Sequence, residues 1–213
     1  YASDKDGAPQ IAFARERVFE VKGQPKWDYF VHEGVKPWAT TQASYAGTWC
    51  VLHKRTEEDQ LADRSRNLKL FEKNLGGLDA RLKFYYGKEL YENKKTSEAY
   101  LVLVDASTME ALEFHDRVLA LQYACYSGMA EADKLKKEHQ DVWIQQIIAL
   151  AHQGLQLDSN RAEFHYIIGE SYLLRNDLLH ALPAFGACAS CINTNPPTGR
   201  HTGALFNYKK LYE

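Results

Sequence analysis

Two segments of this chain carry the same spacing of small and large residues. In each, a glycine precedes an alanine by twelve residues, and a large apolar residue and a small residue follow that alanine by four and by seven. These residues are Gly87, Ala99, Leu103 and Ala106 in the first segment, and Gly169, Ala181, Phe185 and Cys188 in the second. Because small residues at helical intervals let two helices approach closely, the spacing predicts antiparallel helix pairs in which Gly87 faces Ala99 and Gly169 faces Ala181.

The pattern resembles the tetratricopeptide (TPR) repeat, a scaffold built from stacked helix pairs. The resemblance implies a TPR-like α-superhelix of antiparallel helix pairs with a concave face that can hold a partner. A third, weaker unit with a longer connection is expected between the two clear ones, with Leu119, Tyr123 and Ile147 among its apolar residues. Because the repeat is a scaffold, any catalytic chemistry must come from elsewhere in the chain.

Helical periodicity covers the chain from Thr56 onward. A first helix carries apolar residues at helical spacing from Leu61 to Leu75, and the pair Gly76-Gly77 ends it. Tight turns are expected at Asn93-Lys94 and Asn176-Asp177. Further helices are predicted at 79–93, 95–106, 108–128, 137–157, 160–174 and 177–193.

The N-terminal part of the chain has a different pattern. Alternating and aromatic residues predict strands at 11–19, 27–31 and 45–53, which resemble the end of a sheet. The predicted fold class is therefore mainly α with a small N-terminal β segment. The domains are a β-rich segment at 1–55, helical repeats at 56–195, and a tail at 196–213 in which residues 203–212 can form one more short helix.

The predicted strands, which lack the rest of a sheet, have a consequence for the oligomeric state. They carry many large apolar residues for so small a sheet, and exposed strand edges recruit partners. We expect two chains to pair through these strands as a homodimer. Two alternatives stay open: the strands fold back on the first helices, or the chain is a monomer with a partly disordered N-terminus.

Composition excludes several classes of function. The formal net charge of −2 offers no electrostatic basis for binding nucleic acid or an anionic membrane. No apolar run is long enough to span a bilayer, and we expect no signal peptide in these residues. The four cysteines form no disulfide framework, which favours a reducing, cytoplasmic setting. Cys188 and Cys191 form a C-x-x-C without a second ligand pair, so we interpret them as small packing residues.

The order of several short motifs resembles a second family. The motifs are Arg15-x-Arg17-Val-Phe19, Trp27 followed by His32-Glu33, a strand ending in His53, Arg66-Asn-Leu68, and the first repeat at Phe84–Gly87. This order is similar to the C-terminal part of family-2, GT-A type glycosyltransferases that carry a TPR tail. The resemblance implies catalytic roles for Glu33 and His32 at the acceptor side, and a metal or pyrophosphate contact at His53. It also implies a divalent metal, Mg or Mn, for the full-length enzyme.

The donor-binding half of that family, with its Asp-x-Asp motif, would precede residue 1. Asp4-Lys5-Asp6 matches the motif only formally. The chain begins at Tyr1 without a methionine, which favours a fragment or a trimmed chain. We therefore expect this isolated chain to be inactive and to hold no cofactor.

Two functions from different classes follow. The first is the acceptor-binding or partner-binding part of a nucleotide-sugar-dependent glycosyltransferase. The alternative is a stand-alone TPR adaptor that mediates protein–protein interaction without catalysis, and the reading frame upstream of Tyr1 discriminates between them. In either case the first helix of each clear repeat is expected to present a face to a protein partner or a glycan acceptor, unless it packs on a neighbouring domain. The predicted contact residues are Arg81, Phe84, Lys88, Tyr166 and Glu170, beside Glu163.

Overall fold

The computed structural model describes residues 26–31, 34–36 and 57–191. In this part the chain is mainly helical, with seven α-helices and two strands of three residues each. The chain divides into two compact units, Tyr1–Lys73 and Asn74–Glu213, which are described separately below.

The first unit contains a short β pair and one helix. Strand β1 (Lys26–Asp28) pairs antiparallel with β2 (Gly34–Lys36), with Trp27 opposite Val35. Helix α1 (Glu57–Lys73) buries Phe71, and the Phe30 ring meets the Phe71 ring edge-on at a centroid distance of 5.4 Å. The strands predicted at 11–19 and 45–53 lie outside the described residues. The described residues therefore show only this pair of three-residue strands, not a larger β segment.

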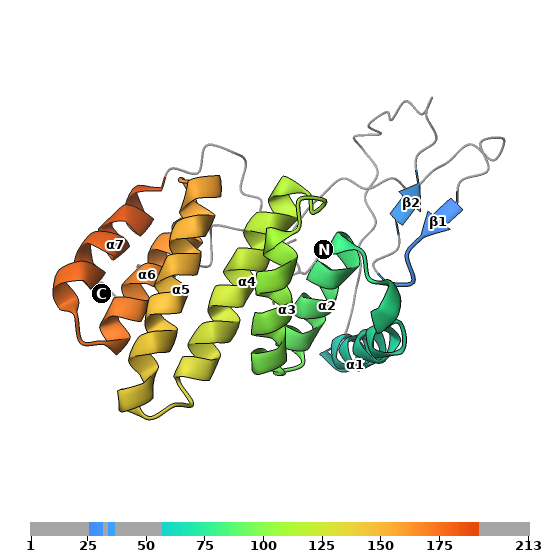
Figure 1. The fold of residues 1–213 in the computed structure, drawn as a ribbon, viewed down its shortest axis with the longest axis horizontal. Coiled ribbons are helices and arrows are strands. Elements are labelled where there is room, and N and C mark those ends of the chain that lie inside the picture. The colour runs from blue at the N-terminus through green and yellow to red at the C-terminus, as the bar shows by residue number, and fades with distance from the viewer. Residues whose placement is uncertain (1–25, 32–33, 37–56, 192–213) are drawn as a thin grey trace. The chain divides into compact units, whose positions relative to one another are not determined.

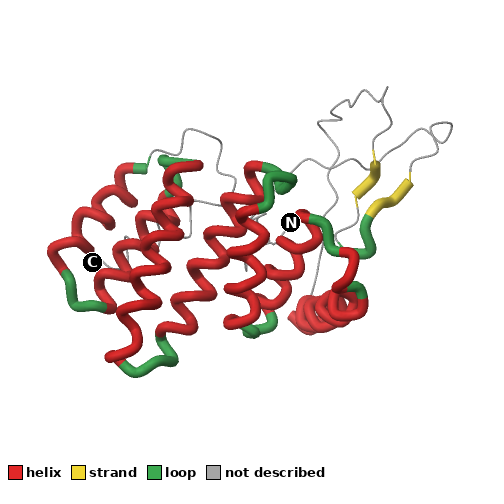
Figure 2. Tube along the Cα trace, viewed as in Figure 1, coloured by secondary structure: helices red, strands yellow, loops and turns green. Residues whose placement is uncertain are grey.

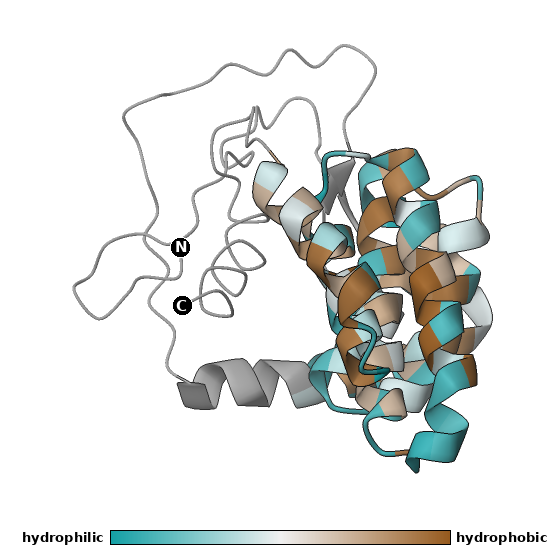
Figure 3. Ribbon diagram, turned by 90° about the vertical axis from the view of Figure 1, so that its left-hand side faces the viewer, coloured by the Kyte–Doolittle hydropathy of each residue, from teal (hydrophilic) through white to brown (hydrophobic). Residues whose placement is uncertain are grey.

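The second unit is a row of six helices packed side by side in chain order (Figures 1 and 2). Each helix contacts the next one, and α2, α4 and α6 also contact each other in succession, so these three form one layer. Hydrophobic (brown) and hydrophilic (teal) segments alternate along these helices (Figure 3). The helices are α2 (Ala80–Glu92), α3 (Thr96–Thr108), α4 (Phe114–Ala132), α5 (Lys137–Leu157), α6 (Ala162–Leu174) and α7 (Leu178–Ser190).

Two of the inter-helix turns have the same geometry. The α2–α3 turn contains Lys94 at φ 62°, and the α6–α7 turn contains Asn176 at φ 57°. In the first turn the Lys95 amide donates to the Leu90 carbonyl (3.0 Å), and in the second the Asp177 amide donates to the Tyr172 carbonyl (2.9 Å). A residue in the left-handed conformation, closed by a hydrogen bond from an amide five residues after the accepting carbonyl, is a standard helix ending. The turns predicted at these two places are confirmed.

One predicted boundary is wrong. The sequence predicted a helix at 108–128, but α3 continues to Thr108 and α4 begins at Phe114. Arg117, one turn into α4, donates from Nη2 to the carbonyls of Met109, Glu110 and Leu112 at 3.0–3.3 Å. These contacts satisfy carbonyls in the connection, so the chain can leave the helical path there.

The side chains nearest to the two glycines lie about one helical turn beyond the alanines that the sequence predicted. A Cβ at Gly87 would lie 2.6 Å from Leu103 Cγ, and a Cβ at Gly169 would lie 2.6 Å from Phe185 Cε1. Each glycine thus makes room for the large residue four positions after the predicted alanine. A Cβ at Gly128 of α4 would likewise lie 2.9 Å from Ile147 Cγ1 of α5. Small residues here interdigitate with large ones, which fills the interior better than small against small.

Replacing Asp79 with alanine is expected to lower the free energy of unfolding by about 1 kcal/mol. The Asp79 carboxylate accepts a hydrogen bond from the Leu82 amide (2.8 Å) and so satisfies one free amide at the start of α2. Urea denaturation measures the loss. Gln153→Ala, on the exposed surface of α5, is the control and should stay within about 0.5 kcal/mol of wild type. Equal stability of the two variants would contradict the capping role.

Candidate functional site

The contact residues predicted from the sequence lie on two helices of the α2–α4–α6 layer. Arg81 and Lys88 are half-buried on α2, and Tyr166 and Glu170 are half-buried on α6. Phe84 is only 1% exposed, so it supports the α2 surface from within and does not face a partner. Helix α4 contacts both α2 and α6. Helix α4 therefore connects the predicted contact residues of α2 with those of α6 in one layer.

Three tyrosines meet where α2 contacts α4. The ring of Tyr91 lies 5.4 Å from that of Tyr123 and 6.4 Å from that of Tyr126, and the last two rings are 6.3 Å apart. Lys88 places its ammonium 5.9 Å from the centre of the Tyr123 ring and 3.8 Å from Glu92. We call Lys88, Tyr91, Tyr123 and Tyr126 the tyrosine cluster.

The hydroxyls of the tyrosine cluster are held neutral. Burial raises the pKa of Tyr91 and of Tyr123, and the nearby Glu92 carboxylate raises both further. Burial also raises the pKa of Tyr126 strongly. A neutral phenol can donate a hydrogen bond as well as accept one. Near neutral pH the cluster therefore combines apolar rings with hydrogen-bond donors.

A buried polar chain connects the tyrosine cluster to the start of α6. The Gln122 amide donates to the Tyr126 hydroxyl (3.1 Å), and the Gln122 carbonyl oxygen accepts from Arg161 Nη2 (2.8 Å). Arg161 is 3% exposed, and its Nε lies 3.6 Å from the carboxylate of Glu163, which is 2% exposed. Charged groups at this depth need partners. Because Arg161 finds one of its partners in Gln122, this hydrogen bond ties the start of α6 to α4.

On α6, the predicted contact residues are partly used within the protein. The Tyr166 ring packs 5.8 Å from that of Phe185 and against Ala162 and Cys188. Burial, followed by the charge and hydrogen bond of Glu170, raises the pKa of Tyr166 to about 12. Glu170 thus holds the Tyr166 hydroxyl, and this end of the surface is less available than the tyrosine cluster.

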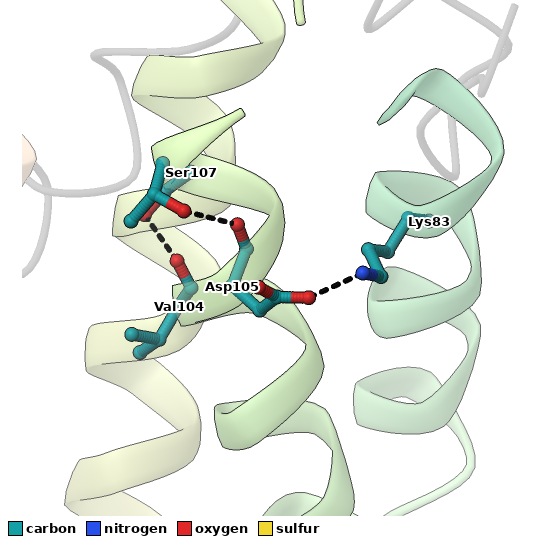
Figure 4. A network of polar contacts seen from close by, with 5 residues as sticks. Lys83, Val104, Asp105 and Ser107 are labelled. Atoms are coloured by element: carbon teal, nitrogen blue, oxygen red, sulfur yellow. Dashed lines mark hydrogen bonds and ion pairs between the residues drawn. The ribbon is translucent and has the colours of Figure 1, made fainter. Parts of the chain in front are cut away.

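An ion pair between α2 and α3 has a structural role. Lys83 of α2 contacts the carboxylate of Asp105 of α3, and Ser107 donates from its hydroxyl to the Val104 carbonyl (2.7 Å) (Figure 4). The pair joins the two helices of one repeat. It involves no residue of the tyrosine cluster.

The remaining candidates for chemistry are few. Among the described residues, no group of three or more His, Cys, Asp or Glu side chains could hold a metal ion. Cys188 is fully buried, and burial raises the pKa of its thiol to about 12, so it is not a reactive thiolate. No helix of the described part is both long and apolar enough to cross a bilayer. His32, Glu33 and His53, to which the glycosyltransferase resemblance assigns catalysis and metal binding, lie outside the described residues.

Comparison with known proteins gives little. No protein-family model matches the sequence, and no curated protein does. Among solved structures, PcrH from Pseudomonas aeruginosa is similar at 15% identity and a TM-score of 0.46, covering 63% of this chain and 97% of PcrH. PcrH in complex with the chaperone binding region of PopB gives 16% identity and a TM-score of 0.47, covering 63% and 98%. At these values we draw no function from the likeness.

Most of the tyrosine cluster was not predicted from the sequence. The predicted contact residues follow from repeat position in the two clear units, and the middle unit has too weak a repeat pattern to give such positions. A usable signal was present nevertheless. Tyr123 and Tyr126 are three residues apart and so share a helix face, and Tyr91 lies four residues after Gly87 on the neighbouring helix.

Proposed function

We propose that the helical part of this chain is a TPR-like scaffold that binds a segment of a partner protein along the surface of α2, α4 and α6. The observation that carries this proposal is the tyrosine cluster, in which two neighbouring helices of one layer bring together three half-buried aromatic rings and Lys88. The stand-alone adaptor is therefore favoured over a catalytic role.

The TPR-like assignment is supported by features of the two clear units. They share the twelve-residue interval from Gly87 to Ala99 and from Gly169 to Ala181. Both units also end their first helix in the same left-handed turn. Repeats of this kind place the first helices of successive pairs in one layer, as α2, α4 and α6 are placed here.

The chemistry of the cluster suits a polypeptide partner. Tyrosine contributes a rigid ring and a polar tip, and it is enriched among the residues that dominate binding energies. Neutral hydroxyls and the Lys88 ammonium are donors, which match the carbonyl oxygens of an extended peptide or a carboxylate side chain. The half-buried rings supply apolar contact at a low entropic cost.

Photo-crosslinking in cells tests the proposal. A benzophenone amino acid placed at position 88 should crosslink a protein partner, whereas the same group at position 153 on α5 should not. Mass spectrometry of the adduct then identifies the bound segment, which can be made as a peptide. No adduct specific to position 88 would overturn the proposal.

Calorimetry with that peptide measures the contribution of the cluster. Tyr123→Ala should weaken binding by about tenfold or more, as expected for a central aromatic contact. Gln153→Ala should bind like the wild type. Thermal denaturation must show that Tyr123→Ala is still folded under the conditions of the titration. Unchanged affinity in a folded variant would contradict the proposed site.

The glycosyltransferase resemblance stays a prediction. It implies that this chain alone has no saturable affinity for a uridine or guanosine diphosphate sugar, which calorimetry can measure. In a longer, active chain, Glu33→Gln should abolish turnover more than donor binding. Full activity of that variant would remove Glu33 from the role of general base.

A further inference from the structure

The last described helix leaves a row of leucines in solvent. On α7, the side chains of Leu178, Leu179 and Leu182 are 62%, 78% and 57% exposed. All three lie in the first two turns of the helix, and the helical spacing of 178 and 182 places those two on one face. We call these three residues the outer face of α7.

In the first repeat the corresponding positions contact the next helix pair. When Ala181 is aligned with Ala99, Leu178 aligns with Thr96 and Leu182 with Tyr100. The Thr96 hydroxyl donates to the Glu131 carboxylate of α4 and accepts from Lys134 Nζ (2.9 Å). The Tyr100 ring lies 3.2 Å from the position of a Cβ at Gly128, also on α4. The outer face of α7 is thus the surface on which one more helix would stack.

The chemistry of the outer face supports this interpretation. Terminal repeats of stacked helical arrays carry a polar outer surface when solvent covers them. Thr96, the corresponding residue of the first repeat, is polar even though α4 covers it. Leu178 of α7, in contrast, is apolar and exposed. An apolar residue at the exposed end of an array indicates that something covers it.

The C-terminal tail of the chain has a matching pattern. Within 203–212, a segment outside the described residues, five of the six apolar side chains lie at intervals of one face of a helix, Ala204, Leu205, Tyr208, Leu211 and Tyr212, whereas Phe206 falls outside that face. Residues 192–202 would connect this segment to α7. The corresponding connections are shorter, at 109–113 between α3 and α4 and at 158–161 between α5 and α6. The connection is therefore long enough for the tail to reach the outer face.

We propose that residues 203–212 form a helix that covers the outer face of α7 and closes the array. The tail occupies the place that the first helix of a fourth pair would take. This proposal is independent of the tyrosine cluster, because it concerns the end of the array and not the surface of α2, α4 and α6.

Hydrogen exchange on the full chain tests the proposal. In a Leu205→Asp/Leu211→Asp variant, the amides of α7 should exchange about tenfold faster than in the wild type, because the covering apolar contacts are lost. Asn207→Asp, between them on the polar side of the same segment, is the matched control and should leave α7 unchanged. Unchanged exchange of α7 in the double variant would overturn the proposal.

A variant on the helix itself provides the second measurement. Leu182→Asp should speed amide exchange of α7 to a similar degree. Adding it to the tail variant should have little further effect, because the two variants break the same contact between α7 and the tail. Leu182 is exposed, so its replacement leaves the core intact. Sedimentation identifies the competing occupant: a wild-type dimer that only Leu182→Asp converts to a monomer would assign the outer face to a second copy and overturn the proposal.

Discussion

Replacing Gly154 with leucine is expected to lower the free energy of unfolding by about 3 kcal/mol, at the upper end of the usual cost of overpacking. Gly154 lies on α5 at the contact with α6, where a Cβ would lie 2.2–2.5 Å from three atoms of the Phe164 ring. Phe164 is fully buried, so its ring has no free space into which it can move. Thermal and urea denaturation measure the loss.

Variants at two further glycines provide a comparison for the stability of Gly154→Leu. Gly169→Leu should also destabilise, by about 1–3 kcal/mol, because its Cβ would lie 2.6 Å from the Phe185 ring. Gly186→Ala is the matched control on α7, where nothing lies within 4 Å of the added Cβ. It should be neutral or stabilising by up to about 1 kcal/mol, since alanine favours a helix over glycine. Similar stability for Gly154→Leu and Gly186→Ala would contradict the close packing of α5 on α6.

Replacing Arg161 with methionine is expected to lower the free energy of unfolding by about 3–5 kcal/mol, the usual cost of breaking a buried ion pair from one side. The change removes the donor to Gln122 and leaves the buried Glu163 carboxylate without the guanidinium that lies 3.6 Å away. Methionine keeps much of the side-chain volume, so the loss is mainly electrostatic. Denaturation in urea measures it.

A second variant separates charge from packing. Arg161→Met/Glu163→Met removes both charges, so it should recover much of the stability that the single variant loses. Arg175→Met is the control, because this arginine pairs with Asp141 at 3.2 Å on the surface and surface pairs contribute about 0–1 kcal/mol. A double variant less stable than Arg161→Met would show that the pair does not act as a unit.

The helical part of the fold was predictable because its signals are local. Apolar periodicity and turn residues placed α5 at 137–157, as observed, and the helix over 79–93 within one residue at each end. The turns at Asn93-Lys94 and Asn176-Asp177 follow from residues that tolerate left-handed backbone or bond to it locally. The start of α4 was missed, because it depends on Arg117 reaching back to carbonyls of the connection.

The candidate site was predictable only in part. Lys88 was selected by its repeat position, and the structure places it beside Tyr123. Phe84 was selected on the same ground but is buried, because repeat position alone does not give the rotation of a helix in its layer. His32, Glu33 and His53 lie outside the described residues, so the roles expected for them stay predictions.

The sequence by itself determined the helices, their order and the glycines on which they pack, because each depends on residues within a few turns of one another. Only the tertiary structure decided which side chains meet across helices. The atoms nearest to a Cβ at Gly87 belong to Leu103, and Tyr91 of α2 meets Tyr123 and Tyr126 of α4. Arg161 joins Gln122 across 39 positions of the chain. Such contacts depend on how rigid helices interdigitate, and local spacing shows only which side chains share a face of one helix.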